Sequence, residues 1–284
     1  MSVRPKKRLG QHFLTDAAVV QAIAEAVRAP AGSHVVEIGA GEGVLTAELL
    51  RAYPRLTAIE VDPEAAAHLR ARFPGLDLRE ADVLDVDWAG MRDGGSGMEG
   101  DTDPLSSRPA SHIPHPPAAP LAVVGNLPYY ITSPILFSLL DARAHVGRAV
   151  LMVQKEVADR LVAPHGSKTY GTLSVYFQLF ARATPLFDVP RTAFRPPPNV
   201  ESAVVQIDFA DGPESLPRPG GVPFEAVQRV VRAAFGQRRK MFRNSVAPLF
   251  AAAGREMPAA FATLRPEAVP PDQFVALARA LVGG

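Results

Sequence analysis

Cysteine is absent from the sequence, which excludes disulfide bonds, thiolate metal sites and a cysteine nucleophile. The seven histidines show no spacing typical of metal ligands, so we expect no metal site. No apolar run approaches the roughly 18 residues that a membrane-spanning helix needs, and the N-terminus lacks the apolar region of a signal peptide. We therefore expect a soluble, cytoplasmic protein that does not interact with membranes.

A net charge is almost absent as well, because 30 basic and 29 acidic residues leave a formal charge of +1. The distribution along the chain is less even. Basic residues cluster between residues 4 and 8, and again in a C-terminal stretch at Arg229, Arg232, Arg238, Arg239, Lys240 and Arg243. Such clusters are typical either of solvated surfaces or of contacts with nucleic-acid phosphates.

The first two thirds of the chain contain short β-branched and apolar runs that alternate with helical patterns. This alternation predicts an α/β fold, in which a mostly parallel sheet carries helices on both faces. The clearest predicted helices are residues 44–53 and 63–72. The predicted strands are residues 34–38, 56–61, 76–80, 121–126 and 148–154, and a later strand within 189–209 is a candidate for an antiparallel edge.

Two segments interrupt this pattern. Residues 91–120 are rich in glycine, serine and proline and predict a flexible surface insertion. Residues 211–222 are typical of an interdomain linker. After them only helical patterns remain, over 223–235, 239–254, 257–264 and 271–282. We predict a domain over residues 1–210 that contains the sheet, and a small all-helical domain over 211–284.

The turn after the first predicted strand contains Gly39, Gly41 and Gly43. Glycines allow the backbone to turn sharply and to approach a ligand closely. A dinucleotide site would have its third glycine where Val44 stands, and the acidic Glu37 before the loop is unfavourable for a pyrophosphate. The loop therefore favours a ligand with a sulfonium and an amino-acid group, although a glycine turn alone is weak evidence.

Two acidic residues follow the next two strands. Glu60 ends the second strand, where a carboxylate can hydrogen-bond both hydroxyls of a ribose, and Asp82 follows the third, where it can accept from an adenine amino group. Ligands of such sheets bind beyond the carboxyl ends of the strands. The ordered set resembles the class I methyltransferase fold, which is Rossmann-like with a mostly parallel seven-stranded sheet and binds S-adenosyl-L-methionine.

A tetrapeptide with its own chemistry, Asn126-Leu127-Pro128-Tyr129, follows the fourth strand. An exocyclic amino nitrogen is a poor nucleophile because its lone pair is delocalised into the ring. Two acceptors on its hydrogens, which we expect to be the Asn126 side-chain oxygen and the Pro128 carbonyl, would favour a pyramidal nitrogen. Tyr129 is suited to stack on an unpaired base. A turn without further function is the plainer alternative, but the tetrapeptide is the N-P-P-Y-type signature of amino-nitrogen methyltransferases.

Further segments resemble one family, the KsgA-type (RsmA) adenine dimethyltransferases of small-subunit ribosomal RNA. The segments are RLGQHFL (8–14), NLPYYITSPIL (126–136), MVQKEVADRL (152–161), AFRPPPNVESAVV (193–205) and FGQRRKMFRNSV (235–246). The resemblance implies an enzyme that dimethylates two adjacent adenines near the 3′ end of 16S rRNA, within the small subunit or its precursor. It also implies that the protein is a monomer and uses S-adenosyl-L-methionine.

The resemblance assigns roles to residues of this chain. It implies cofactor contacts at His12, Leu14, Gly39, Gly41, Glu60, Asp82 and Asn126. It implies that Asn126 and Pro128 hold the target amino group, and that Tyr129 and Phe194 sandwich the adenine. Three prolines after Phe194 favour an exposed loop there. RNA phosphate contacts are implied for Arg238, Arg239, Lys240 and Arg243.

Three other functions are compatible with parts of this pattern. A methyltransferase of large-subunit rRNA, of the antibiotic-resistance type, would share the fold, the cofactor and the tetrapeptide. A non-enzymatic ribosome-assembly or transcription factor would have a damaged glycine loop or tetrapeptide, and both are intact here. A dinucleotide-dependent oxidoreductase is disfavoured by the glycine spacing.

Overall fold

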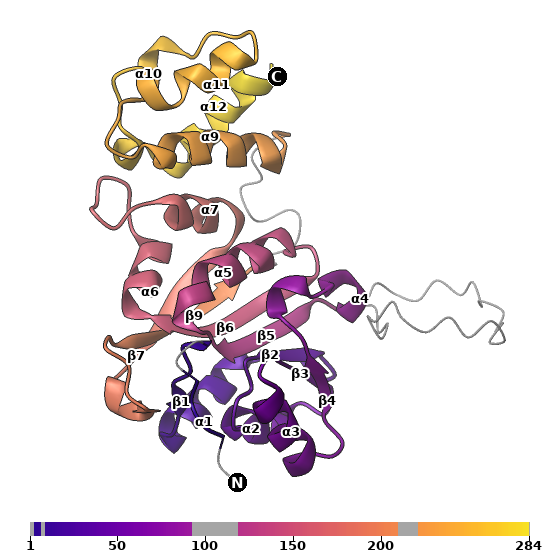
Figure 1. Ribbon diagram of the computed structural model, residues 1–284. Coiled ribbons are helices and arrows are strands. Elements are labelled where there is room, and N and C mark those ends of the chain that lie inside the picture. Colours follow the sequence, from indigo (N-terminus) through magenta and orange to yellow (C-terminus); the bar gives the residue numbers. More distant parts are fainter. Residues whose placement is uncertain (1–2, 7–8, 93–118, 210–220, 284) are drawn as a thin grey trace, which may run out of the picture. The chain divides into compact units, whose positions relative to one another are not determined.

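The computed structural model describes residues 3–6, 9–92, 119–209 and 221–283 (Figure 1). Residues 93–118 of the predicted insertion, and the predicted domain boundary at 210–211, lie outside the described residues. Seven strands form one sheet in the order β4-β3-β2-β5-β6-β9-β7, and β1 with β8 forms a separate two-stranded sheet. The chain divides into two compact units, residues 1–152 with 191–199, and residues 153–190 with 200–284.

The first unit contains the parallel strands. These are β2 (Val35–Ile38), β3 (Leu56–Glu60), β4 (Asp77–Glu80), β5 (Leu121–Asn126) and most of β6 (Val146–Gln154), and each neighbouring pair is parallel. Every residue of β2 and β3 is buried, as expected for strands that are covered on both faces. The five predicted strands are therefore confirmed, with ends shifted by at most two residues.

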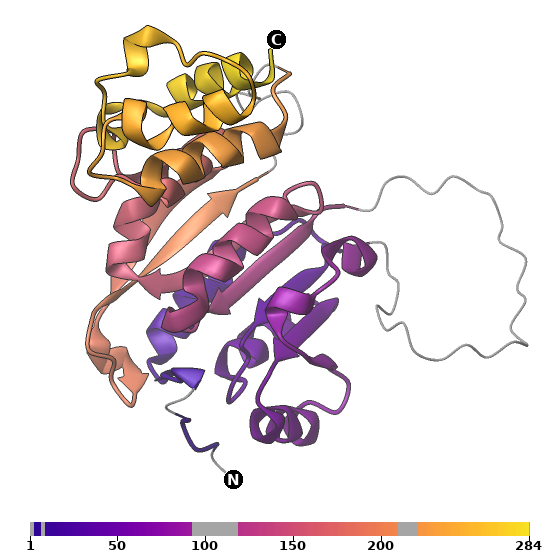
Figure 2. The same ribbon diagram turned by 45° about the horizontal axis from the view of Figure 1, so that its top comes forward.

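Helices cover both faces of these strands (Figures 1 and 2). On one face lie α1 (Ala17–Val27), α2 (Val44–Ala52) and α3 (Pro63–Arg72), and on the other α4 (Trp88–Arg92) and α5 (Thr132–Asp141). The start of α3 is fixed by sequence, because the Asp62 side chain accepts from the Glu64 N–H and Pro63 occupies the first turn. The Trp88 ring N–H donates to Ser138 at 3.2 Å and joins α4 to α5.

The small sheet joins the N-terminal segment to a distant loop of the same unit. Strand β1 (Phe13–Leu14) pairs antiparallel with β8 (Phe194–Arg195), so that Leu14 lies opposite Phe194 and Phe13 opposite Arg195. The Ala193 carbonyl accepts from the Thr15 N–H at 2.8 Å and from the Thr15 hydroxyl at 3.1 Å. Residues 13–15 are thereby held to residues 193–195.

The second unit contains α6 (Lys155–Val162), α7 (Thr172–Phe180) and the antiparallel pair β7 (Arg182–Val189) and β9 (Ser202–Asp208). Strand β9 confirms the late antiparallel strand, but β7, which was not predicted, is the edge strand of the sheet. Strand β7 is weakly signalled because Pro185 interrupts it and most of its residues are exposed. A proline is tolerated at an edge, where its missing N–H breaks no ladder of hydrogen bonds.

The C-terminal segment is helical as predicted, with corrections. Helices α9 (Phe224–Gly236) and α12 (Pro271–Val282) match their predicted ranges closely. The predicted helix 239–254 is instead two short helices, α10 (Phe242–Ser245) and α11 (Ala247–Ala252), because Pro248 has no N–H to donate to the Asn244 carbonyl. The predicted helix 257–264 is only a 3-10 turn, η5 (Ala259–Phe261), which follows Pro258.

The compact units do not coincide with the predicted domains, since α9 to α12 belong to one unit with α6, α7, β7 and β9. No helix among the described residues is long and apolar enough to cross a membrane. Within the same residues no group of three potential ligand side chains could hold a metal ion.

Candidate cofactor and substrate site

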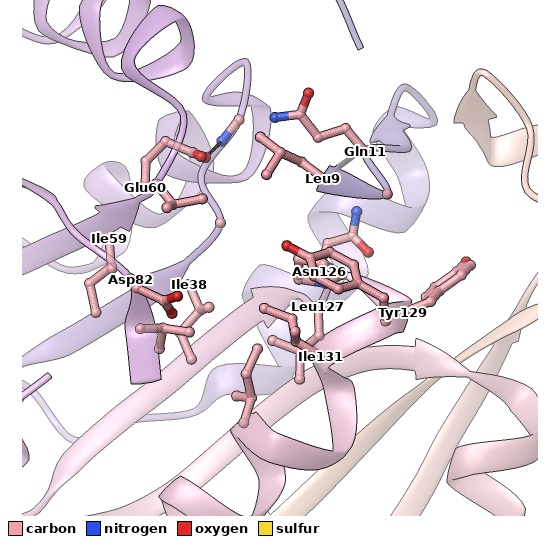
Figure 3. A pocket seen from close by; sticks show the side chains of 18 of the residues that line it. Leu9, Gln11, Ile38, Ile59, Glu60, Asp82, Asn126, Leu127, Tyr129 and Ile131 are labelled. Atoms are coloured by element: carbon pink, nitrogen blue, oxygen red, sulfur yellow. Dashed lines mark hydrogen bonds between the residues drawn. The ribbon is translucent and has the colours of Figure 1, made fainter. Parts of the chain in front are cut away.

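A pocket of the first unit lies beyond the carboxyl ends of β2, β3 and β5 (Figure 3). All predicted cofactor residues except Leu14 line it, namely His12, Gly39, Gly41, Glu60, Asp82 and Asn126. Leu14 is buried beneath the small sheet, with 4% of its surface exposed. Figure 3 shows Asp82 and Ile59 on one side of the pocket and Asn126 and Tyr129 on the other.

The glycine loop adopts a conformation that other residues disfavour. The φ angles of Gly39, Gly41 and Gly43 are +70°, +55° and +73°. Space is short as well, because a Cβ atom on Gly43 would lie 2.6 Å from the Phe73 ring. A Cβ atom on Gly41 would lie 3.1 Å from the ring of Phe13. The loop therefore exposes main-chain atoms to the pocket without any side chain in front of them.

Glu60, at the end of β3, holds this loop in place through hydrogen bonds to its main chain. One of its carboxylate oxygens accepts from the Gly41 N–H and the other from the Asp62 N–H, both at 2.9 Å. Burial raises the pKa of Glu60 above its ordinary value, against the opposing effect of these donors. A carboxylate has about four acceptor positions, so two remain for hydroxyl groups of a ligand.

Glu37 lies directly under the loop and does not line the pocket. It is 1% exposed, and its carboxylate accepts from the Thr46 hydroxyl at 2.6 Å. Burial raises the pKa of Glu37 to about 7, and the negative charge of Glu60 adds to this effect. Glu37 is thus a buried carboxyl group that titrates near neutral pH.

The wall around Asp82 suits a flat apolar ring with polar edges. The Asp82 carboxylate caps a short turn by accepting from the Leu84 N–H at 2.9 Å. Ile38, Ile59 and Val83 line the pocket beside it. The sequence did not reveal these apolar residues as part of the site, because nothing in their spacing distinguishes them from core residues. It also assigned no contact to Leu9, Gly10 or Gln11, which lie across the opening.

Asn126 is anchored through its nitrogen. Its side-chain amide donates to the main-chain carbonyl of His12 at 3.0 Å, so its oxygen remains the acceptor end of the group. The acceptor that orients the Asn126 amide therefore comes from the N-terminal segment rather than from its own strand. This contact joins residues that are more than a hundred positions apart in the chain.

Pro128 lines the pocket, but its carbonyl is already engaged. It accepts from the Ile131 N–H at 3.2 Å and from the buried Thr132 hydroxyl at 3.0 Å. A carbonyl has two lone pairs, so the predicted role of this oxygen as an acceptor for a target amine is poorly supported. The preceding residue, Leu127, also lines the pocket.

The aromatic residues are arranged differently from the expectation. Tyr129 lines the pocket and is stacked on the His12 ring, with centroids 5.7 Å apart and planes at 26°. Phe194 is 4% exposed and does not line the pocket, because β8 turns its side chain to the buried side with Leu14. The expected exposed position of Phe194 was wrong: the prolines begin only at Pro196, after the strand has ended.

An unpredicted cluster holds the N-terminal segment over the pocket. The buried Asp62 carboxylate pairs with the Lys6 ammonium and accepts from the Gln11 amide at 3.0 Å. Burial alone would raise the pKa of Asp62, but the hydrogen bonds from Lys6 and Gln11 outweigh it and lower the pKa. Lys6, a member of the N-terminal basic cluster, thus pairs with a carboxylate of the protein itself.

The C-terminal basic cluster belongs to the second unit. Arg239, Lys240 and Arg243 are exposed. Arg238 is half-buried, and its guanidinium donates to the Lys168 carbonyl at 2.6 Å. Three of the four predicted phosphate contacts are therefore available to a ligand, and Arg238 is engaged within the protein.

The strand order, with an antiparallel last strand and a glycine loop after the first parallel strand, defines the class I methyltransferase fold. The model of the family described as "Ribosomal RNA adenine dimethylase" matches residues 3–268. The chain belongs to this family.

Curated relatives agree with this assignment. The "Ribosomal RNA small subunit methyltransferase A" of Salinibacter ruber is 45% identical over 98% of this chain and 85% of its own length. The protein of that name from Xanthomonas axonopodis pv. citri is 43% identical over 87% of this chain and 85% of its own length.

Among solved structures, a dimethyladenosine transferase from Plasmodium falciparum has a TM-score of 0.69 at 23% identity, covering 94% of this chain and 96% of its own. The 23S rRNA methyltransferase ErmE has a TM-score of 0.62 at 24% identity, covering 95% and 99%. Both show similarity of fold.

Proposed function

We propose that this protein dimethylates the 6-amino groups of two adjacent adenosines near the 3′ end of 16S rRNA, with S-adenosyl-L-methionine as methyl donor. The observation that carries the proposal is the anchored Asn126 amide at the end of β5, beside a pocket with a glycine loop and two carboxylates. The relatives named as small-subunit methyltransferases support this substrate over large-subunit RNA.

The pocket residues fit the cofactor. Bare backbone at Gly39 and Gly41 accommodates its amino-acid end, and the remaining acceptor positions of Glu60 suit the ribose hydroxyls. Asp82, between Ile59 and Val83, suits an adenine with its amino group toward the carboxylate. The bound cofactor would supply an electrophilic methyl group to the other side of the pocket.

The protein's contribution to the reaction is positioning. The Asn126 oxygen accepts one hydrogen of the target amino group, and a main-chain carbonyl, which we assign to Leu127, accepts the other. Held in this way, the nitrogen would present its lone pair to the methyl group of a bound cofactor. The C–N bond would form as the C–S bond breaks, the sulfur would leave with that electron pair as a neutral thioether, and the cationic amine would then lose its proton to water, so no general base is needed to form the C–N bond. Tyr129 supplies the stacking surface, and the role of Phe194 requires its ring to leave its buried position.

RNA outside the target bases is held by the second unit in this proposal. The exposed Arg239, Lys240 and Arg243 are suited to phosphate contacts, within a C-terminal helical domain that begins near residue 211. A substrate of this kind places the protein in the cytoplasm, where it acts as a monomer on the small subunit or its precursor.

The test is transfer of labelled methyl groups from S-adenosyl-L-methionine to small ribosomal subunits that lack the modification, with large subunits as the parallel substrate. The proposal predicts label in the small subunits only. Label confined to large subunits would show instead that the protein methylates large-subunit rRNA, as enzymes of the antibiotic-resistance type do. Cofactor binding without label in either substrate would favour an assembly factor.

A further inference from the structure

A solvent-exposed cation, Arg195, stands on the small sheet, and its partner in the sheet, Phe13, lines the pocket. Arg195 is exposed, whereas Phe194 before it is buried, as the alternation of a strand requires. Within the described part of the chain, its guanidinium forms no ion pair or hydrogen bond. The prediction from sequence assigned no role to this residue.

The strand register determines the direction of the Arg195 side chain. Residues directly opposite each other in an antiparallel pair project from the same face. Arg195 lies opposite Phe13, and the Phe13 ring lies so close to Gly41 that a Cβ atom there would be 3.1 Å away. Arg195 therefore projects on the face of the small sheet that faces the glycine loop.

The backbone that carries Arg195 is well supported. The Ala193 carbonyl accepts two hydrogen bonds from Thr15, and β8 pairs with β1. On the other side, the His12 ring donates through Nδ1 to the Pro196 carbonyl at 2.7 Å, since a carbonyl can only accept. Because the His12 ring also stacks on Tyr129, Arg195 is fixed relative to the surface on which we expect the target base to stack.

We propose that Arg195 binds a backbone phosphate of the RNA next to the target adenosine, an inference that rests on the proposed function. A guanidinium is suited to bidentate contact with a phosphate, and the fixed backbone at Arg195 keeps its side chain close to the pocket opening. The carboxylate of the cofactor is an anion of similar chemistry. Arg195 does not line the cofactor pocket, and a base attached to a polymer must bring its phosphates past the pocket opening.

The experiment compares R195Q, R195K and R55Q with the wild-type protein. Arg55 is an exposed arginine just before β3, at the amino end of the parallel strands and thus at the opposite edge of the sheet. Binding to small subunits that lack the modification is measured over a series of salt concentrations. Cofactor binding is measured in the absence of RNA, and kcat and KM are determined for methyl transfer.

For R195Q we expect an affinity for the subunit that is weaker by about tenfold or more, roughly the loss of one charge-assisted hydrogen bond, and a KM raised in proportion with little change in kcat. The slope of log Kd against log salt should fall by about 0.7 to 0.9, the value for one phosphate contact. R195K keeps the charge and should keep the slope, whereas R55Q should behave as the wild type.

An unchanged slope for R195Q, or an equal change for R55Q, would overturn the inference. Weaker cofactor binding with an unchanged slope would mean that Arg195 binds the cofactor carboxylate instead. If R195Q lowers the slope as expected but the wild-type protein methylates no small subunits, the proposed function fails and the phosphate contact stands.

Discussion

The buried carboxyl group of Glu37 should make the stability of the first unit depend on pH, and the Glu37→Gln substitution isolates this dependence. The folded-state pKa is about 7, against 4.5 for the ordinary group. Between these values the folded protein keeps a proton that the unfolded chain has lost. The free energy of unfolding therefore falls as the pH rises from 4.5 to 7, and the loss is complete above pH 7.

The size of the effect follows from the difference between the two pKa values. A difference of 2.5 units, at about 1.4 kcal/mol for each unit, corresponds to roughly 3 kcal/mol. Glutamine cannot ionise and can still accept from the Thr46 hydroxyl. The difference in free energy of unfolding between E37Q and the wild type should therefore shift in favour of E37Q by up to this amount as the pH rises from 4.5 to 8.

The assay is denaturation by urea at a series of pH values, followed by tryptophan fluorescence. The chain has a single tryptophan, Trp88, which is buried in the same unit as Glu37. Thr46→Val provides an internal check: without the hydroxyl donor the pKa of Glu37 should be higher still, so the decline should extend to higher pH. A difference between E37Q and the wild type that does not vary with pH would refute the reasoning.

Three further predictions concern the loop, the amide and the basic cluster. G43A should lower the free energy of unfolding by about 2–4 kcal/mol, because Gly43 has a φ of +73° and an added Cβ atom would clash with Phe73. The control is G32A, because Gly32 has a φ of +80° but no neighbour within 4 Å, and it should lose only about 1–2 kcal/mol in the same urea denaturation. Equal losses in the two variants would show that the clash with Phe73 contributes nothing. N126A should lower kcat about 10²–10³-fold in single-turnover assays while RNA binding persists, and parallel loss of both would remove its assigned role. Replacing Arg239 and Lys240 with glutamine should weaken RNA binding and flatten its salt dependence, and an unchanged slope would mark a merely solvated surface.

The parallel strands and the cofactor carboxylates could be predicted because their signals are local. A run such as 121–124 is apolar throughout when a strand is buried on both faces, and Glu60 stands at the carboxyl end of another buried strand. Tertiary pairing leaves no such signal. Strand β7 is exposed and contains Pro185, and the two-residue strands β1 and β8 are too short for any periodicity.

The same distinction applies to the site. Asn126 was predicted from its tetrapeptide, but the His12 carbonyl that orients it could not be, since a main-chain contact across the fold has no residue signature. Lys6 was grouped with neighbouring cations because its partner Asp62 is distant in sequence. Phe194 was expected in an exposed loop because the pairing of β8 with β1 was unknown.

The central claim is tested most directly by identifying the methylated base. Small subunits that lack the modification are incubated with the protein and S-adenosyl-L-methionine, and the 16S rRNA is digested and examined by mass spectrometry. The account predicts N6,N6-dimethyladenosine at two adjacent positions near the 3′ end, absent when N126A is used. Methyl groups on another base, on the ribose or at unrelated adenosines would contradict it.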